Sequence, residues 1–337
     1  MLKSITGLDL INLRKDSFTM PQWFTWGLGE EMDKIMPLLE KGRLCVFSGA
    51  AGSGKTTWSF EMALQNAEKG VKEGFGVGYL SLEVAPLRPV QRYGERAAGM
   101  DKLDKMYGMV DVIAEDRAIP FNAAIERIIN SNLLIVPDNE ESAGKISYIE
   151  SICANESGPA VLFIDNLAEI DPEKNIIGEY DKYDYIIRSL LDIAKNTDTT
   201  IVLLHHTAKI KEGDKQTVNT IKGNNIIVTK ADIVVAINQI KILNPNWKFK
   251  DLNREEDPVE DRVRNAVMAK APKLDVRAIE IFKDRDWDER GVKGYLYLDG
   301  AITKARTQYE YKNDFPLLPE QQLLFDKLLE KYKLIAK

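Results

Sequence analysis

The most informative stretch of the sequence is Gly49-Ala50-Ala51-Gly52-Ser53-Gly54-Lys55-Thr56-Thr57. It fits the pattern G-x-x-x-x-G-K-[ST] of a phosphate-binding loop. Glycines let the backbone curl so that successive N–H groups point at phosphate oxygens, and the helix that follows adds its unpaired N-terminal donors. We expect Lys55 to reach the β- and γ-phosphates of a nucleotide and the Thr56 hydroxyl to bind Mg²⁺.

The neighbours of this stretch support the same interpretation. The apolar run Leu44–Ser48 precedes it and predicts a buried strand, and Thr57–Glu68 predicts a helix. A strand, a glycine loop and a helix in this order favour a phosphate-binding loop over a glycine-rich surface turn.

Strands and helices alternate along most of the chain, which predicts an α/β fold with a mainly parallel, twisted sheet and helices on both faces. Beyond about residue 232 the pattern changes, and further strands follow with little helix between them, which predicts later, partly antiparallel strands. Besides the first strand and helix, we expect strands at Gly78–Leu82, Leu133–Val136, Val161–Ile164, Thr200–Leu204, Ile233–Ile237, Ala266–Ala269, Ala278–Phe282 and Gly294–Leu298, and helices at Met32–Leu39, Pro86–Ala98, Phe121–Asn130, Ile146–Ala154 and Tyr183–Lys195.

The 337 residues suffice for one large α/β domain with appendages or for two modest domains. We expect an N-terminal arm or linker over 1–42, an ATPase-type domain over 43–305 and a C-terminal helical tail over 306–337. Pro21–Gly27 is rich in aromatic residues. This aromatic segment packs either on its own domain or on a neighbouring subunit.

Composition excludes several classes of protein. No apolar run is long enough for a membrane span, and the N-terminus lacks the apolar core of a signal peptide. Cys45 and Cys153 are too few for a disulfide framework or a zinc site, which suits a cytoplasmic protein. The net charge of −6 gives no global basic surface, so any contact with nucleic acid must come from a local patch.

Polar residues follow three of the predicted strands. Asp165 ends an apolar strand and is expected to hold Mg²⁺ through water, near Thr56. Glu83 ends the second strand, where a carboxylate can orient and deprotonate a water that attacks the γ-phosphate; the alternative is a solvated charge. The only histidines, His205 and His206, end the strand Thr200–Leu204. A γ-phosphate sensor fits this position better than a metal site, and one of the two is an interior residue in the alternative interpretation.

Four segments then resemble a known family in the correct order. Tyr79–Glu83 resembles the strand ending in Ser-Leu-Glu of the DnaB-like replicative helicases, which are RecA-fold ATPases. Phe163–Leu167 is similar to that family's Ile-Asp-x-Leu segment, and Leu204–His206 aligns with its sensor strand. Ala231–Val235 resembles the Ala-Asp and apolar strand after its DNA-binding loop. The resemblance covers roughly Leu38–Asp299.

This resemblance implies a RecA-like P-loop NTPase core that hydrolyses ATP with Mg²⁺. It assigns water activation to Glu83, metal coordination to Thr56 and Asp165, and the sensor role to His206. It also matches Arg92 to an arginine near the nucleotide in relatives, although a surface charge is the alternative.

The resemblance has two departures. The family's Lys-x-Arg, which contacts the neighbouring subunit's ATP, falls near Ala269–Lys273, where no arginine stands at the expected position. Lys270 can replace the lysine of this motif. The residue that replaces its arginine is Lys273 or Arg277, or is absent. Lysine lacks the planar fork of arginine, so the replacement is not neutral. The arm over 1–42 is also too short to be the helical N-terminal domain of the cellular helicases.

The polar segment Thr207–Lys230 corresponds to the loop that grips single-stranded DNA in the central channel of hexameric relatives. Five lysines against Glu212 and Asp214 give it a local charge of +3, and an ordinary solvated loop is the alternative. The lysines are Lys209, Lys211, Lys215, Lys222 and Lys230.

The sequence thus predicts an ATP-hydrolysing, DnaB-like ring motor on single-stranded DNA, a homo-oligomer that we expect to be a hexamer, with a loader or primase as a further partner. The alternatives are a KaiC- or RadA-like regulatory or recombination ATPase, and an ATP-gated assembly protein that does not unwind DNA. A P-loop small-molecule kinase is less well supported, because the sequence shows no basic lid.

Overall fold

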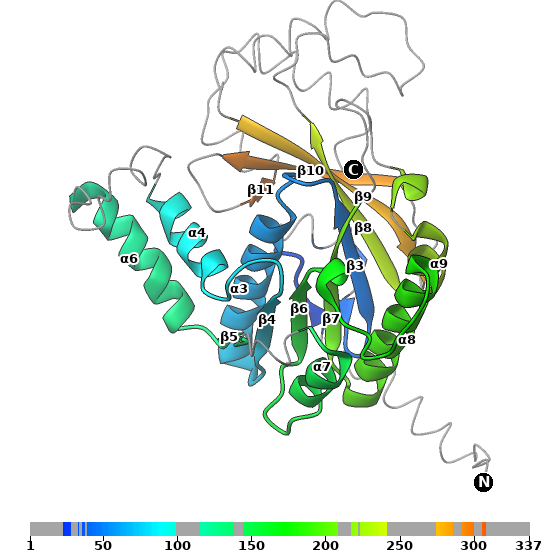
Figure 1. Ribbon diagram of the computed structural model, residues 1–337. Coiled ribbons are helices and arrows are strands. Elements are labelled where there is room, and N and C mark those ends of the chain that lie inside the picture. The colour runs from blue at the N-terminus through cyan, green and yellow to red at the C-terminus, as the bar shows by residue number, and fades with distance from the viewer. Residues whose placement is uncertain are drawn as a thin grey trace, which may run out of the picture.

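The computed structural model is built around one large β-sheet with helices on both faces (Figure 1). A separate pair of short strands, β1 and β2, forms a second sheet. The structure describes residues 23–27, 33, 36–37, 39–98, 115–137, 144–207, 217–221, 223–240, 274–285, 291–299 and 305–307.

Within the described residues, the sheet has nine strands in the order β11-β10-β9-β8-β3-β7-β6-β4-β5. The six strands from β8 to β5 are mutually parallel, whereas β9, β10 and β11 are antiparallel to their neighbours. The parallel strands are β3 (Leu44–Gly49), β4 (Val77–Ser81), β5 (Leu133–Ile135), β6 (Val161–Asp165), β7 (Thr200–His206) and β8 (Ile233–Ile240). The antiparallel strands are β9 (Leu274–Asp284), β10 (Gly291–Asp299) and β11 (Ala305–Thr307).

The helices divide between the two faces according to the direction of the chain. The connections from β3 to β4 and from β4 to β5 run toward one edge and lie on one face, and those from β5 back to β8 lie on the other. Right-handed crossovers require this division. The first face carries α3 (Lys55–Glu73), α4 (Arg88–Ala97) and α6 (Glu115–Ile129), and the second carries α7 (Ile146–Cys153), α8 (Glu179–Thr197) and α9 (Asn224–Lys230).

The central strands are apolar throughout because both of their faces are covered. In β3, Cys45 and Phe47 join the cluster beneath α3, while Leu44 and Val46 join the cluster beneath α8. All four side chains are fully buried. The alternation follows from the two-residue period of a strand. The parallel pairing of β3, β7, β6 and β4 places their carboxyl ends side by side at one edge.

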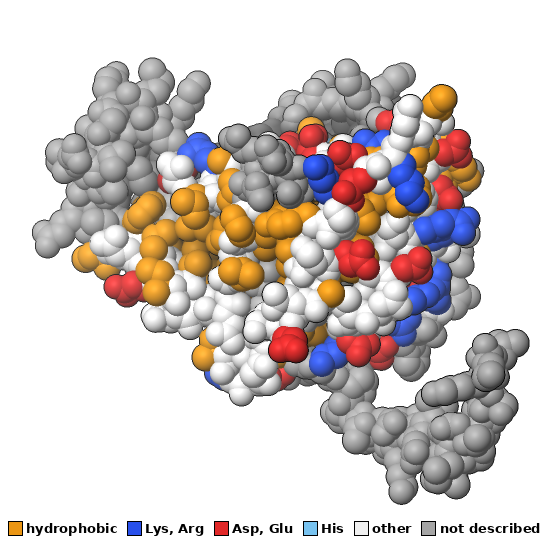
Figure 2. Space-filling model, turned by 60° about the horizontal axis from the view of Figure 1, so that its bottom comes forward, with side chains coloured by type: hydrophobic (Ala, Val, Ile, Leu, Met, Phe, Trp, Pro, Cys, Tyr) orange, Lys and Arg blue, Asp and Glu red, His pale blue; other side chains and the backbone are white. Residues whose placement is uncertain are grey.

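Several large hydrophobic side chains remain on the surface of the described part of the chain. Figure 2 shows hydrophobic side chains gathered over one part of the face that it presents. Such a concentration is typical of a contact surface. The exposed large hydrophobic residues are Val71, Leu87, Ile119, Ile129, Leu134, Ile177 and Tyr180.

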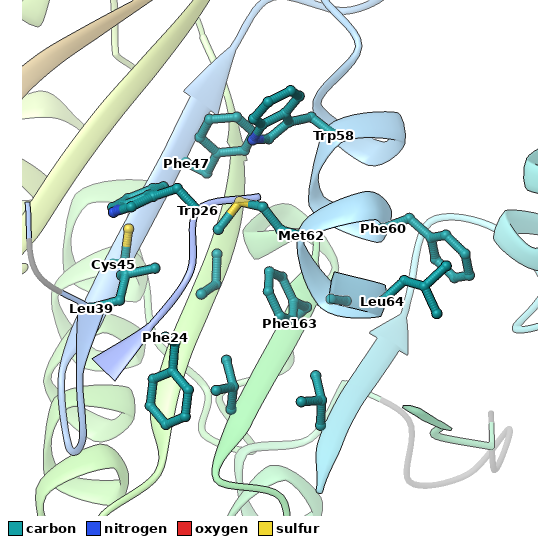
Figure 3. Packing of buried hydrophobic residues seen from close by; sticks show 14 of the residues in the cluster. Phe24, Trp26, Leu39, Cys45, Phe47, Trp58, Phe60, Met62, Leu64 and Phe163 are labelled. Atoms are coloured by element: carbon teal, nitrogen blue, oxygen red, sulfur yellow. The ribbon is translucent and has the colours of Figure 1, made fainter. Parts of the chain in front are cut away.

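The aromatic segment belongs to the hydrophobic core of this chain. Strand β1 (Trp23–Phe24) pairs with β2 (Leu39–Glu40), and Phe24 and Trp26 are 4% and 2% exposed. Figure 3 shows both among the buried side chains beside α3. Asn66 of α3 holds the backbone of Thr25 through two hydrogen bonds, of 2.9 and 2.8 Å. Of the two alternatives, packing on its own domain is therefore confirmed for the described part of this segment.

The predicted strands and helices within the described part of the chain are confirmed, with two differences. Thr207–Lys230 is not loop throughout, because a 3-10 turn (Val218–Thr220) and α9 occupy its second half. Helix α9 forms because Ile226 and Ile227 are buried against the sheet. The predicted helix Met32–Leu39 is wrong for three of its four described residues, because Met36 and Pro37 are not helical and Leu39 belongs to β2.

Some predictions lie outside the described residues. They include the strand Ala266–Ala269 and, from residue 308 on, the helical tail predicted over 306–337. The first two residues of that predicted tail, Arg306 and Thr307, are described and belong to strand β11, so they are not helical. The division into 1–42, 43–305 and 306–337 stays a prediction. No helix among the described residues is long and apolar enough to cross a membrane.

Candidate active site

The phosphate-binding loop connects β3 to α3, and its glycines are required by its shape. Gly52 and Gly54 have φ angles of 75° and 91°, a region that residues with side chains rarely adopt. A Cβ at Gly49 would lie 2.5 Å from Ser53 Oγ and 2.7 Å from the Ile237 side chain. The Ser53 N–H donates to Ala50 O at 3.1 Å and closes the turn. The loop therefore presents backbone to an incoming ligand at the carboxyl edge of the sheet.

Lys55 points back into this loop. Its ammonium donates to Gly49 O at 2.7 Å and to Ala50 O at 2.9 Å, and it lies 3.2 Å from His206 Nδ1. Burial lowers the pKa of Lys55 to about 8, and the nearby charges of Asp165 and Glu83 oppose this shift. Because an ammonium only donates, Nδ1 of His206 is the acceptor, and Nε2 carries the proton in the neutral ring.

Thr56 and Asp165 form the next pair along this edge. Thr56 Oγ1 donates to Asp165 Oδ2 at 2.7 Å, and the Tyr79 hydroxyl lies 3.4 Å from the same oxygen. Asp165 is 1% exposed, and burial raises the pKa of its carboxyl group; the charge of Glu83 adds to this rise, whereas the Thr56 hydrogen bond opposes it.

The donor set at this pair suits a hard cation. Asp165 Oδ1 is buried without a hydrogen-bond partner in the described part of the chain, which is unusual for a carboxylate oxygen. A hydroxyl and a carboxylate are ligands that Mg²⁺ accepts, and it takes its remaining ligands from water and phosphate. Among the described residues there is no group of three or more His, Cys, Asp or Glu side chains that could hold a metal by itself. The pair therefore fits a Mg²⁺ that arrives with a nucleotide.

Glu83 lies just beyond the end of β4, beside the same cluster. Its Oε2 accepts a hydrogen bond from Asn166 Nδ2 at 2.7 Å and lies 3.3 Å from His206 Nε2. Partial burial raises the pKa of Glu83, but the hydrogen bonds from His206 and Asn166 and the charge of Lys55 outweigh it, so the net pKa is lowered. The side chain is 46% exposed. Glu83 is thus an ionised carboxylate within reach of water.

His205, the other histidine, is an interior residue. It is 1% exposed and packs edge-on against Tyr183, with 5.8 Å between ring centroids. His205 and His206 are neighbours on a strand, so their side chains point to opposite faces of the sheet. Only His206 reaches the cluster of Lys55 and Glu83.

The structure also shows polar contacts that the sequence analysis missed. Arg96, one turn beyond Arg92 on α4, donates a hydrogen bond to Thr57 Oγ1 on the first turn of α3. Arg92 itself is half-buried on the same helix, and its contact with a nucleotide stays a prediction. Asn166, which donates to Glu83, is a second contact that the sequence analysis missed. Its position directly after Asp165 was the one signal in the sequence that could have pointed to it.

Most residues predicted to contact DNA or a neighbouring subunit lie outside the described part of the chain. They are Lys209, Lys211, Lys215, Lys222, Lys270 and Lys273. Arg277 lies on β9, where its backbone is paired with Gln239 and Leu296. Lys230, counted above in the positive segment, instead pairs with Asp184 of α8 at the end of α9.

Comparison with known proteins identifies the family. The family described as "DnaB-like helicase C terminal domain" matches residues 27–285. The replicative DNA helicase DnaB of Treponema pallidum (strain Nichols) is 22% identical over 208 residues, which are 62% of this chain and 46% of the relative. The chain thus spans less than half the length of that curated relative.

Solved structures show the same fold. One solved ATPase domain superposes with a TM-score of 0.65 at 17% identity, over 89% of this chain and 97% of that one. A DnaB-like replicative helicase, whose structure describes its interactions with primase, gives a TM-score of 0.62 at 17% identity, over 89% of this chain and 66% of that one. The sheet is therefore that of the RecA-like helicase ATPase domains, and the chain belongs to the family of DnaB-like helicase C-terminal domains.

Proposed function

We propose that this chain is the ATP-hydrolysing motor of a DnaB-like ring helicase that moves on single-stranded DNA. The observation that carries the proposal is the cluster at the carboxyl edge of the sheet. There the side chains of Lys55, His206 and Glu83 form one chain of contacts at hydrogen-bond distance, and Thr56 and Asp165 form a hydrogen-bonded pair beside it. In a family of helicase ATPase domains, this is the set of groups that ATP hydrolysis needs.

In this proposal the loop from Gly49 to Thr57 binds the phosphates through backbone N–H groups. Lys55 exchanges its contacts with Gly49 O and Ala50 O for phosphate oxygens, and Thr56 and Asp165 hold Mg²⁺. The ion, when bound, neutralises the charge that develops on the phosphates. Arg96 keeps the first turn of α3 in place through Thr57.

Glu83 acts as the general base. Its Oε2 is occupied by Asn166 and His206, whereas Oε1 makes no hydrogen bond within the described part of the chain. Oε1 can therefore orient a water and accept its proton as the water attacks the γ-phosphorus. His206 lies between Lys55 and Glu83, so its ring is placed to register whether the lysine contacts phosphate or the loop.

Coupling to DNA is assigned to the segment that follows His206. Lys209, Lys211, Lys215 and Lys222 would contact the DNA backbone, and α9 anchors the end of this segment on the sheet. Lys230 belongs to that anchor through its ion pair with Asp184 and is not one of the proposed DNA contacts.

The trans contact to a neighbour's ATP is assigned to Lys270, Lys273 or Arg277, next to or on β9. Assembly into a hexamer is part of the proposal, and the exposed hydrophobic side chains in Figure 2 support a contact between subunits. A loader or a primase is proposed as a further partner. The proposal also includes a cytoplasmic location, which fits two buried cysteines that form no disulfide.

The deciding experiment measures the ATPase rate with and without single-stranded DNA, together with the mass in solution. The proposal expects an oligomer whose turnover rises with DNA, and displacement of a strand from a forked duplex. Turnover that ignores DNA would favour an ATP-gated assembly protein. Stimulation by DNA without strand displacement would favour a recombination-type ATPase.

A further inference from the structure

We propose that Asn166 is a positioning residue that holds the Glu83 carboxylate in place for catalysis; this inference rests on the function proposed above. Asn166 is 2% exposed and stands directly after β6. Its Nδ2 donates to Glu83 Oε2 at 2.7 Å. A bond of this length to a charged acceptor is stronger than one between neutral groups.

The other end of the amide fixes its orientation. Asn166 Oδ1 accepts the backbone N–H of Ala168 at 2.9 Å, at the start of the short 3-10 helix Leu167–Glu169. If the amide turned over, its NH₂ group would face that N–H, and its oxygen would face the Glu83 carboxylate. Both contacts would then be repulsive, so the amide holds one orientation and keeps an N–H group aimed at Glu83.

The backbone brings the two residues together. The N–H groups of Leu82 and Glu83 both donate to Asp165 O, at 2.7 and 3.1 Å. The chain beyond β4 is thus fastened to the last residue of β6, one residue before Asn166. Without the Asn166 contact, the half-exposed Glu83 side chain would keep His206 as its one hydrogen-bond partner among the described residues, and it would sample other rotamers.

The residue that positions Glu83 is therefore separate from the residues that bind the nucleotide in the ground state. Asn166 touches Glu83 and not the phosphate-binding loop, whose Lys55 and Thr56 contacts are made elsewhere. Misplacing a catalytic group by about 1 Å can cost roughly a hundredfold in rate. Loss of the Asn166 donor should therefore lower kcat and leave the KM for ATP nearly unchanged.

Asn166→Asp is the sharpest test because aspartate keeps the oxygen that accepts from Ala168, and it caps a helix start as well as asparagine does. It replaces the donor that faces Glu83 with a carboxylate oxygen, which repels the Glu83 carboxylate. Asn166→Ser is the second variant; its hydroxyl can also cap, but it is one bond too short to reach Glu83. ATP turnover, affinity for a fluorescent ATP analogue and thermal unfolding are measured for both, at a temperature where circular dichroism shows each variant folded.

The expected result is a kcat lower by roughly a hundredfold in both variants, with KM and analogue affinity within about twofold of wild type. In a Glu83→Gln background the same changes should have no further effect on residual turnover, because the residue through which Asn166 acts is already disabled. Wild-type kcat in the Asp and Ser variants would overturn the inference and leave the proposed function intact, as would a raised KM with unchanged kcat. A wild-type chain that does not hydrolyse ATP, with or without DNA, would overturn both.

Discussion

Trp26 should contribute more to stability than its position near the N-terminus suggests. Its side chain is 2% exposed, and its Nε1 donates to Pro37 O at 2.6 Å. It shares one hydrophobic cluster with Leu39, Cys45 and Met62 (Figure 3). Trp26→Ala removes the ring and leaves a cavity between the aromatic segment and the sheet.

The expected loss follows from the buried area. A tryptophan buries about 200 Å², which at about 25 cal/mol per Å² corresponds to about 5 kcal/mol. The alanine that replaces it recovers part of this, and large-to-small changes of aromatic core residues cost about 3–5 kcal/mol. We therefore expect the free energy of unfolding to fall by about 4 kcal/mol. Trp26→Phe keeps most of the packing but leaves the Pro37 carbonyl without its donor, and should cost about 1–3 kcal/mol.

Equilibrium unfolding in guanidinium chloride, followed by circular dichroism, measures both losses from the shift of the midpoint. Ile177→Ala is the matched control, since its side chain is 88% exposed and its removal should change stability by less than about 0.5 kcal/mol. A loss below about 1 kcal/mol for Trp26→Ala would refute the reasoning. The aromatic segment would then be a separable arm and not part of the core.

Three further predictions concern chemistry and DNA. Lys55→Ala should lose tight ATP binding, whereas Glu83→Gln should bind an ATP analogue normally and release phosphate about 10²–10⁴-fold more slowly; normal turnover would place the base elsewhere. Lys215→Ala with Lys222→Ala should lower the salt slope of log K for single-stranded DNA by about 1.4, at unchanged basal ATPase rate; an unchanged slope would contradict the channel assignment. Burial raises the pKa of Cys153 from 9.0 to about 12, so less of its thiol is ionised at pH 8. Iodoacetamide should therefore label Cys153 about a thousandfold more slowly in the folded chain than in urea. Equal labelling rates would show that the thiol is exposed.

Local pattern was sufficient to predict the elements that build the site. The glycines of the loop, the apolar runs of β3 and β6, and the polar residues just after them are all readable within a few positions. Parallel strands end at a common edge, so Asp165 and Glu83 could be expected near Lys55 without knowledge of the packing. Helix α9 was missed because two isoleucines in a polar segment are too short a signal, and only their burial against the sheet makes the helix stable.

Which side chains touch one another was decided by the tertiary structure. Arg92 and Arg96 lie one turn apart on α4, and the sequence could not show that Arg96 reaches Thr57, because the angle between α4 and α3 sets that choice. The sequence could not tell whether the aromatic segment packs on its own domain or on a neighbouring subunit, because both surfaces would be apolar. In the structure, Phe24 and Trp26 of this segment pack beside α3 of the same chain.

The sequence by itself determined the phosphate-binding loop and the succession of strands along the chain, because these depend on backbone conformation and on periodicity over short distances. The family followed from the resemblance of four short motifs to those of known helicases. Only the tertiary structure joined Asn166 to Glu83, which are 83 positions apart. It also placed the His206 ring against Lys55, in line with the sensor role that the resemblance had implied for His206. Such contacts depend on the register of β4, β6 and β7 to within one residue, and a shift of one residue would turn each of these side chains to the opposite face.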